Sequence, residues 1–137
     1  MEGYRKHRVL FERLEATIIA ASVDGIEDMK LLAEGKRFPN REKEMGFHLC
    51  YGVSRELANT LGAYWYDHEL GKDKSYILGA DKDYMQPAEF IIDCKLKKVI
   101  SCAYSDGGLG RMDAGDVVGV LSSIQDITTE VPHVWSW

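Results

Sequence analysis

Apolar residues recur along the first part of the chain with a spacing that switches between helix and strand. Residues 2–15 carry an apolar stripe at helical spacing, which consists of Tyr4, His7, Leu10, Phe11 and Leu14. Residues 17–23 then form a short run rich in β-branched side chains, typical of a strand covered on both faces. A second helix is predicted to follow, because Asp24 stands three residues before Glu27 as in a capping box, and Gly35 ends it.

The middle of the chain carries a weaker pattern with more polar positions. Residues 36–45 are charged and contain Pro39, which predicts a loop, and residues 47–51 have the composition of another short strand. Ser54 is placed to cap a helix whose apolar positions are Leu57, Ala58, Leu61 and Tyr64. Residues 67–86 are mixed in composition, so we expect a long surface loop with room for a helical turn.

The clearest strand pattern lies in the last third of the chain. Residues 88–93 and 98–104 are two β-rich runs joined by a tight polar linker, which predicts a β-hairpin. Asp113 then caps a final helix with one apolar face, formed by Val117, Val120, Leu121 and Ile124. Strands that alternate with helices and end in a hairpin favour an α/β layer sandwich. No repeat or linker divides residues 1–137, so we expect a single domain with a C-terminal tail at residues 128–137.

Composition and charge narrow the partners of such a domain. The chain has 17 Lys and Arg against 22 Asp and Glu, a formal net charge of −5, which argues against a nucleic acid or an anionic membrane as partner. The apolar runs are too short to span a bilayer and the charged N-terminus is unlike a signal peptide, so a cytoplasmic location is expected. Three cysteines in neither a CxxC pair nor a regular framework indicate free, mostly buried thiols in a reducing compartment.

Four segments of the sequence, taken in order, match strands and turns of one known family. Residues 17–24 read TIIAASVD and residues 87–93 read PAEFIID, while residues 46–62 and the pair Gly110-Arg111 add two looser matches. In this order and spacing, the segments resemble the peroxiredoxin-like AhpC/TSA family of the thioredoxin-fold superfamily over nearly the whole chain. The resemblance implies a thioredoxin-like three-layer α/β/α sandwich and thiol-based redox chemistry, either peroxide reduction or thiol–disulfide exchange.

The segment that carries the chemistry of this family is not found. In the family, the reactive cysteine stands at the N-terminus of the first helix, after a central strand, where the helix dipole and free N–H groups lower the pKa of the thiol. Here the corresponding helix begins at Met1, with neither the strand nor the cysteine before it. We therefore expect a fold that is incomplete at the N-terminus, no catalytic residue, and a domain that is inactive as residues 1–137.

Two explanations for the missing cysteine stay open. Met1 is an internal methionine of a longer enzyme, or the chain is a natural relative that keeps the scaffold as a non-catalytic binding or assembly module. The peroxidase arginine at the entrance to the hairpin is absent too, because Pro87 holds the matching position. The resemblance makes Pro87 an active-site-proximal residue, like the cis-proline beside the redox cysteines of thioredoxin-type oxidoreductases, and it predicts a cis Gln86–Pro87 bond.

The missing central strand has a structural consequence. Without it, residues 17–23 and 88–93 are apolar strands with unpaired backbone groups, which folded proteins do not leave bare. We expect either that these strands close up on each other or that a second chain fills the gap, as in a homo-oligomer. The aromatic tail at residues 131–137 is a candidate for packing between chains.

The cysteines that the chain does contain are weaker candidates for chemistry. Cys50 lies in an apolar strand, where a buried inert thiol is the favoured interpretation, while Cys94 stands at the hairpin turn beside Lys95, which modestly favours the thiolate. Cys94 and Cys50 are therefore the secondary redox candidates. Cys102 is expected to fill a sheet face opposite Phe90, which makes a disulfide with Cys94 improbable.

No metal site and no cofactor site is expected from the remaining motifs. Asp67-His68-Glu69 are consecutive and do not converge on one ion, so a solvated turn is the favoured interpretation. Residues 107–110 are rich in glycine but lack the lysine and the spacing of a phosphate-binding loop. They predict a sharp turn out of the hairpin instead.

Overall fold

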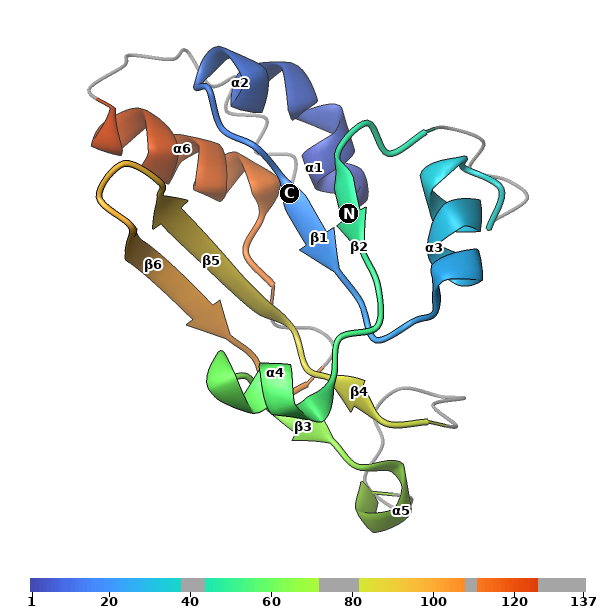
Figure 1. Cartoon of the computed structure of the whole chain (residues 1–137). Coiled ribbons are helices and arrows are strands. Elements are labelled where there is room, and N and C mark those ends of the chain that lie inside the picture. The colour runs from blue at the N-terminus through green and yellow to red at the C-terminus, as the bar shows by residue number, and fades with distance from the viewer. Residues whose placement is uncertain (38–43, 72–81, 108–110, 126–137) are drawn as a thin grey trace, which may run out of the picture. The chain divides into compact units, whose positions relative to one another are not determined.

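The computed structural model describes residues 1–37, 44–71, 82–107 and 111–125, which form a mixed α/β fold (Figure 1). The helices are α1 (Glu2–Lys6), α2 (Arg8–Arg13), α3 (Ile26–Ala33), α4 (Arg55–Thr60), α5 (His68–Gly71) and α6 (Ala114–Ile124). The strands are β1 (Ile19–Ala21), β2 (His48–Cys50), β3 (Trp65–Tyr66), β4 (Tyr84–Met85), β5 (Ala88–Asp93) and β6 (Lys98–Tyr104). None of the helices in these ranges is long and apolar enough to cross a membrane. The turn at residues 108–110 and the tail at residues 128–137 lie outside the described residues.

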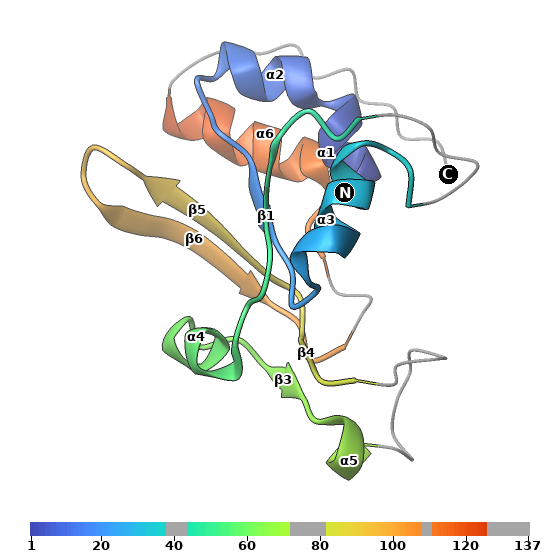
Figure 2. The same cartoon turned by 45° about the vertical axis from the view of Figure 1, so that its right-hand side comes forward.

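The strands pair two by two. β1 and β2 run parallel, because the His48 N–H donates to the Ile18 carbonyl at 3.2 Å and the Ser22 N–H donates to the Cys50 carbonyl at 3.1 Å. β3 and β4 form a short antiparallel ladder, and β5 and β6 form a longer one that is seen as an extended hairpin in Figure 2. β1 and β5 belong to different sheets and are not hydrogen-bonded neighbours.

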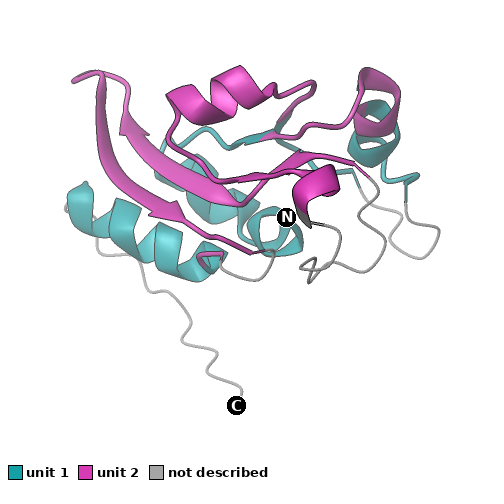
Figure 3. Ribbon diagram, turned by 90° about the horizontal axis from the view of Figure 1, so that it is seen from below, with its two compact units in different colours: residues 1–20, 30–48, 113–137 teal, residues 21–29, 49–112 magenta. Residues whose placement is uncertain are grey.

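The chain divides into two compact units, which are coloured separately in Figure 3. Unit 1 comprises residues 1–20, 30–48 and 113–137, and it contains α1, α2 and α6. Unit 2 comprises residues 21–29 and 49–112, and it contains α4, α5 and the strands from β3 to β6. All the site candidates, namely the three cysteines and Pro87, therefore belong to unit 2.

The core of unit 1 is formed by the apolar stripe predicted for residues 2–15. Leu14 is fully buried, Phe11 is 3% exposed, and the rings of Tyr4 and Phe11 stack with their centroids 5.6 Å apart. The stripe is divided between α1 and α2, because the helix is interrupted at His7, whose φ and ψ of −92° and 6° are not helical. The expected single helix is thus two short ones that share one apolar side.

α6 packs in unit 1 with a face that differs from the predicted one. Its buried positions are Ala114, Val117, Val118 and Ser122. Of the four residues that the sequence pattern selected, only Val117 is buried. α6 and α1 approach closely: a Cβ atom on Gly3 would lie 3.5 Å from the Ala114 Cβ. This approach turns the Ala114 side of α6 inward, a tertiary effect that the pattern of one helix does not contain.

Three of the predicted helix ends are confirmed. The Ser54 hydroxyl accepts a hydrogen bond from the Leu57 N–H at 3.1 Å at the start of α4. The Asp113 carboxylate accepts from the Gly115 N–H at 2.8 Å at the start of α6. Gly35 follows α3 with a φ of +71°, a left-handed conformation that glycine adopts without steric cost.

The hairpin is confirmed with the predicted bounds. Phe90 lies opposite Cys102, and the register shifts by one residue after Ile91, which indicates a bulge on β6. In the turn, the Asp93 carboxylate accepts hydrogen bonds from two backbone N–H groups at 2.8 and 2.9 Å, and Lys97 adopts a φ of +51°. An aspartate that binds the turn amides in this way stabilises the reversal without help from the rest of the fold.

Two sequence predictions about strands and loops are wrong. The run at residues 17–23 is shortened to β1 and is not covered on both faces, because Ile19 is 65% exposed. The loop expected at residues 67–86 does contain a helical turn, α5, but it also contains β4, which pairs with β3 and was not predicted. Both errors concern contacts with distant parts of the chain, which decide burial and pairing but leave no mark on the local pattern.

Leu14→Ala should lower the free energy of unfolding by about 2–5 kcal/mol, because it empties a fully buried position. Leu96→Ala removes the same atoms from the hairpin turn, where Leu96 is 72% exposed, and should change the free energy by less than about 0.5 kcal/mol. Denaturant unfolding followed by circular dichroism measures both values. Similar losses for the two variants would contradict the assignment of Leu14 to the core.

Candidate functional site

The three cysteines of unit 2 are free and exposed. Cys94 lies in the hairpin turn, as predicted, and is exposed there, whereas the expected burial of Cys50 and Cys102 is wrong. Among the described residues, β2 and β6 each pair with one strand only, and most side chains of β6 are exposed. Cys50 ends β2, Cys94 lies in a turn and Cys102 lies on β6, so none of the thiols stands in the first turn of a described helix.

Cys102 shares a strand face with Tyr104, whose ring packs edge-on against Phe90 with centroids 5.7 Å apart. The Tyr104 hydroxyl donates to the Leu61 carbonyl at 2.8 Å and so ties β6 to the end of α4. Desolvation raises the pKa of Tyr104, and the neighbouring thiol of Cys102 raises it further. On this face of the hairpin, Phe90 and Tyr104 therefore pack against each other, and the exposed thiol of Cys102 lies beside them.

Pro87 stands between β4 and β5, and the bond before it is trans. No peptide bond between described residues is cis, so the predicted cis Gln86–Pro87 bond is wrong. The Gln86 N–H donates to the Tyr64 carbonyl at 2.8 Å, and the Pro87 carbonyl accepts from the Ser105 N–H at 3.0 Å. The first hydrogen bond continues the ladder of β3 and β4, and the second continues the ladder of β5 and β6. The trans form, which X–Pro bonds ordinarily prefer, is compatible with both hydrogen bonds.

Gln86 is the buried polar residue next to Pro87. Its side chain is hydrogen-bonded to that of Tyr84, but its amide oxygen has no hydrogen-bond partner among the described residues, although Gln86 is only 6% exposed. Burial raises the pKa of Tyr84, the stacked Tyr66 adds to the shift, and the bond to Gln86 opposes it. An unpartnered buried carbonyl is unfavourable in a folded protein, so this oxygen marks a place where a donor would be favourable.

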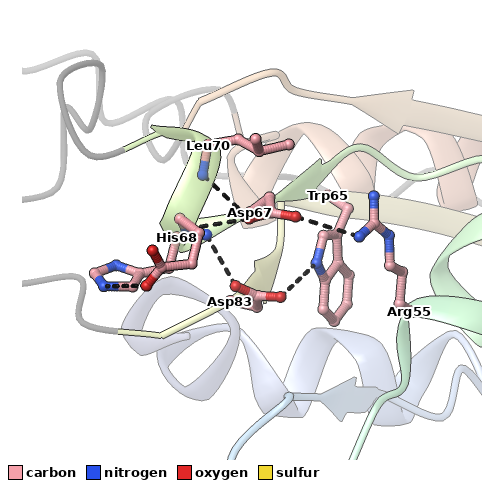
Figure 4. Close-up of polar contacts among 7 residues, drawn as sticks. Arg55, Trp65, Asp67, His68, Leu70 and Asp83 are labelled. Atoms are coloured by element: carbon pink, nitrogen blue, oxygen red, sulfur yellow. Dashed lines mark hydrogen bonds and ion pairs between the residues drawn. The ribbon is translucent and has the colours of Figure 1, made fainter.

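Two aspartates next to this region hold α5 in place (Figure 4). The Asp83 carboxylate accepts from the His68 N–H at 2.8 Å and from the Trp65 indole N–H at 3.4 Å. The His68 N–H lowers the pKa of Asp83 most, with smaller contributions from Trp65 and from the positive charge of Arg55. Asp83 thus joins β4 to β3 and to the start of α5.

Asp67 is the second of these aspartates. Its carboxylate accepts from the Glu69 and Leu70 N–H groups at 3.1 and 3.2 Å, and it forms an ion pair with Arg55 at 3.4 Å (Figure 4). Asp67-His68-Glu69 is therefore a capped helical turn on an exposed surface. The described parts of the chain contain no cluster of three or more His, Cys, Asp or Glu side chains suited to hold a metal ion.

The Ser22–Asp24 motif joins the ends of β1 and β2. The Ser22 hydroxyl donates to the Asp24 carboxylate at 2.9 Å, and the Asp24 carbonyl accepts from the Gly52 N–H at 2.9 Å. Lys82 donates to the other carboxylate oxygen of Asp24 at 2.7 Å. Ser22 and Asp24 therefore have a structural role: their hydrogen bonds connect the end of β1 to Gly52 after β2 and to Lys82.

Comparison with solved structures shows a mixed α/β fold similar to that of peroxiredoxins, a thioredoxin-like fold, and so confirms at the level of fold the resemblance seen in the sequence. The chain is similar to the structure of AhpC from Mycobacterium bovis, with a TM-score of 0.64 and 22% identity over 97% of this chain and 63% of that one. It is also similar to a cysteine-to-serine mutant of peroxiredoxin 6 from Arenicola marina, with a TM-score of 0.65 and 20% identity.

The likeness is one of fold and does not extend over the whole of these proteins. The match to peroxiredoxin 6 covers 88% of this chain and 51% of that one, so the chain spans between half and two thirds of the two solved structures. No family model matches the sequence, and no curated protein matches it.

Sequence reasoning missed several residues of this region, chiefly Gln86, Asp83 and the stacked pair Tyr66 and Tyr84. The signal for the aromatic pair was weak: β3 and β4 are two residues each, and 17 positions lie between them. No local pattern indicates that Gln86 is buried. The three consecutive aromatic residues Tyr64, Trp65 and Tyr66 were the available hint of a strand, because aromatic residues are enriched in strands.

Asp83→Asn tests the charge of Asp83, because the amide oxygen still accepts the His68 N–H. The pKa of Asp83 is lower in the folded protein than its value of about 3.8 in the unfolded chain. The carboxylate therefore stabilises the fold at pH values above 3.8, and this stabilisation is lost as the pH falls through the lower native pKa. We expect the wild type to be more stable than the variant at neutral pH and the difference to shrink in acid. Urea unfolding of both proteins from neutral to acid pH measures this difference, with Asp106→Asn as control. A difference independent of pH would contradict the assignment.

Gln86→Met removes the unpartnered amide oxygen while keeping the length of the side chain. We expect the free energy of unfolding to stay within about 1 kcal/mol of the wild type or to rise, because the lost bond to Tyr84 is offset by the removed desolvation cost. Gln86→Glu places a carboxylate at the same buried position and should destabilise by about 2 kcal/mol or more. Denaturant unfolding of both variants measures this contrast. A large loss with methionine would show that the oxygen has a partner in solution.

Proposed function

We propose that the chain is the scaffold of a thiol-dependent antioxidant protein or oxidoreductase, which acts in peroxide reduction or thiol–disulfide exchange. The observation that supports this class is the fold, which is similar to those of AhpC and peroxiredoxin 6 over 97% and 88% of the chain. A complete thioredoxin-like three-layer sandwich would also need the central strand that the sequence resemblance implies.

The chemistry of this class sets a strict requirement on one thiol. A cysteine thiolate attacks the O–O bond of a peroxide, an S–O bond forms as the O–O bond breaks, and the departing oxygen takes up a proton. The thiolate is available at neutral pH only where a helix N-terminus or neighbouring cations lower its pKa. Cys50, Cys94 and Cys102 lie on strands or in a turn. For this reason we propose that residues 1–137 alone do not turn over peroxide or disulfide substrates.

Cys94 remains the best placed of the three thiols if one of them reacts. It is exposed in the hairpin turn, next to Lys95 in the sequence. Cys50 is the next candidate, because it is exposed at the end of β2.

A non-catalytic binding or assembly module is the alternative function. One observation favours it: among the described residues, β5 has a strand neighbour on one side only. The other edge of such a strand offers backbone N–H and C=O groups to a second polypeptide.

Assays of peroxide reduction and of disulfide reduction separate these functions. We expect the chain of residues 1–137 to be no faster than a variant in which Cys50, Cys94 and Cys102 are all serine. Three single Cys→Ser variants are the matched controls. Activity that one of these substitutions abolishes would contradict the proposal and would assign the reaction to that cysteine.

A second measurement uses the coding sequence upstream of Met1. If it encodes a cysteine within a few residues, the extended chain should gain peroxidase or disulfide-reductase activity, and substitution of that cysteine by serine should abolish the gain. An extended chain that contains such a cysteine and stays inactive would contradict the redox function and favour the binding module.

A further inference from the structure

We draw no further inference here: the strongest candidate, the surface patch at the turn between β5 and β6 where the exposed Lys95, Lys97 and Lys98 flank the exposed Leu96, carries nothing because nothing in the structure shows what covers it.

Discussion

The ladder between β5 and β6 is the constraint on which the candidate region of this protein depends. Its register places Phe90 opposite Cys102, sets Cys94 in the turn, and continues through the Pro87–Ser105 hydrogen bond to the junction with β4. The Asp93 carboxylate stabilises the reversal by binding two turn amides. A slip of one residue would move every side chain of the hairpin to the opposite face, so the surroundings of Pro87 and of two cysteines depend on this pairing.

The exposure of the cysteines in this chain depends on how many strands pair in each sheet, and less on their neighbours in the sequence. Apolar neighbours in the sequence indicate burial for Cys50 and Cys102, yet both are exposed, because β2 and β6 belong to sheets of two strands. Exposure alone does not make a thiol reactive, since the pKa depends on nearby cations and helix ends. Among the described residues, none of the three thiols stands in the first turn of a helix.

The sequence predicted those features whose cause is local. Ser54 and Asp113 cap their helices, Gly35 ends α3, and the hairpin has the expected bounds, because each is decided by a few adjacent residues. The features that the sequence did not predict are decided by distant residues. The inward face of α6 depends on the approach of Gly3, and the ladder of β3 and β4 joins segments far apart in the chain. The burial of Gln86 is of the same kind.

The buried side chain of Gln86 restricts the structure around Pro87. Gln86 is 6% exposed, and its amide oxygen has no hydrogen-bond partner among the described residues. Its backbone N–H donates to the Tyr64 carbonyl at 2.8 Å, so the backbone of Gln86 is held by the ladder of β3 and β4. The residue that joins this ladder to β5 therefore combines a fixed backbone with an unsatisfied side chain, an unfavourable arrangement that the surrounding packing has to offset.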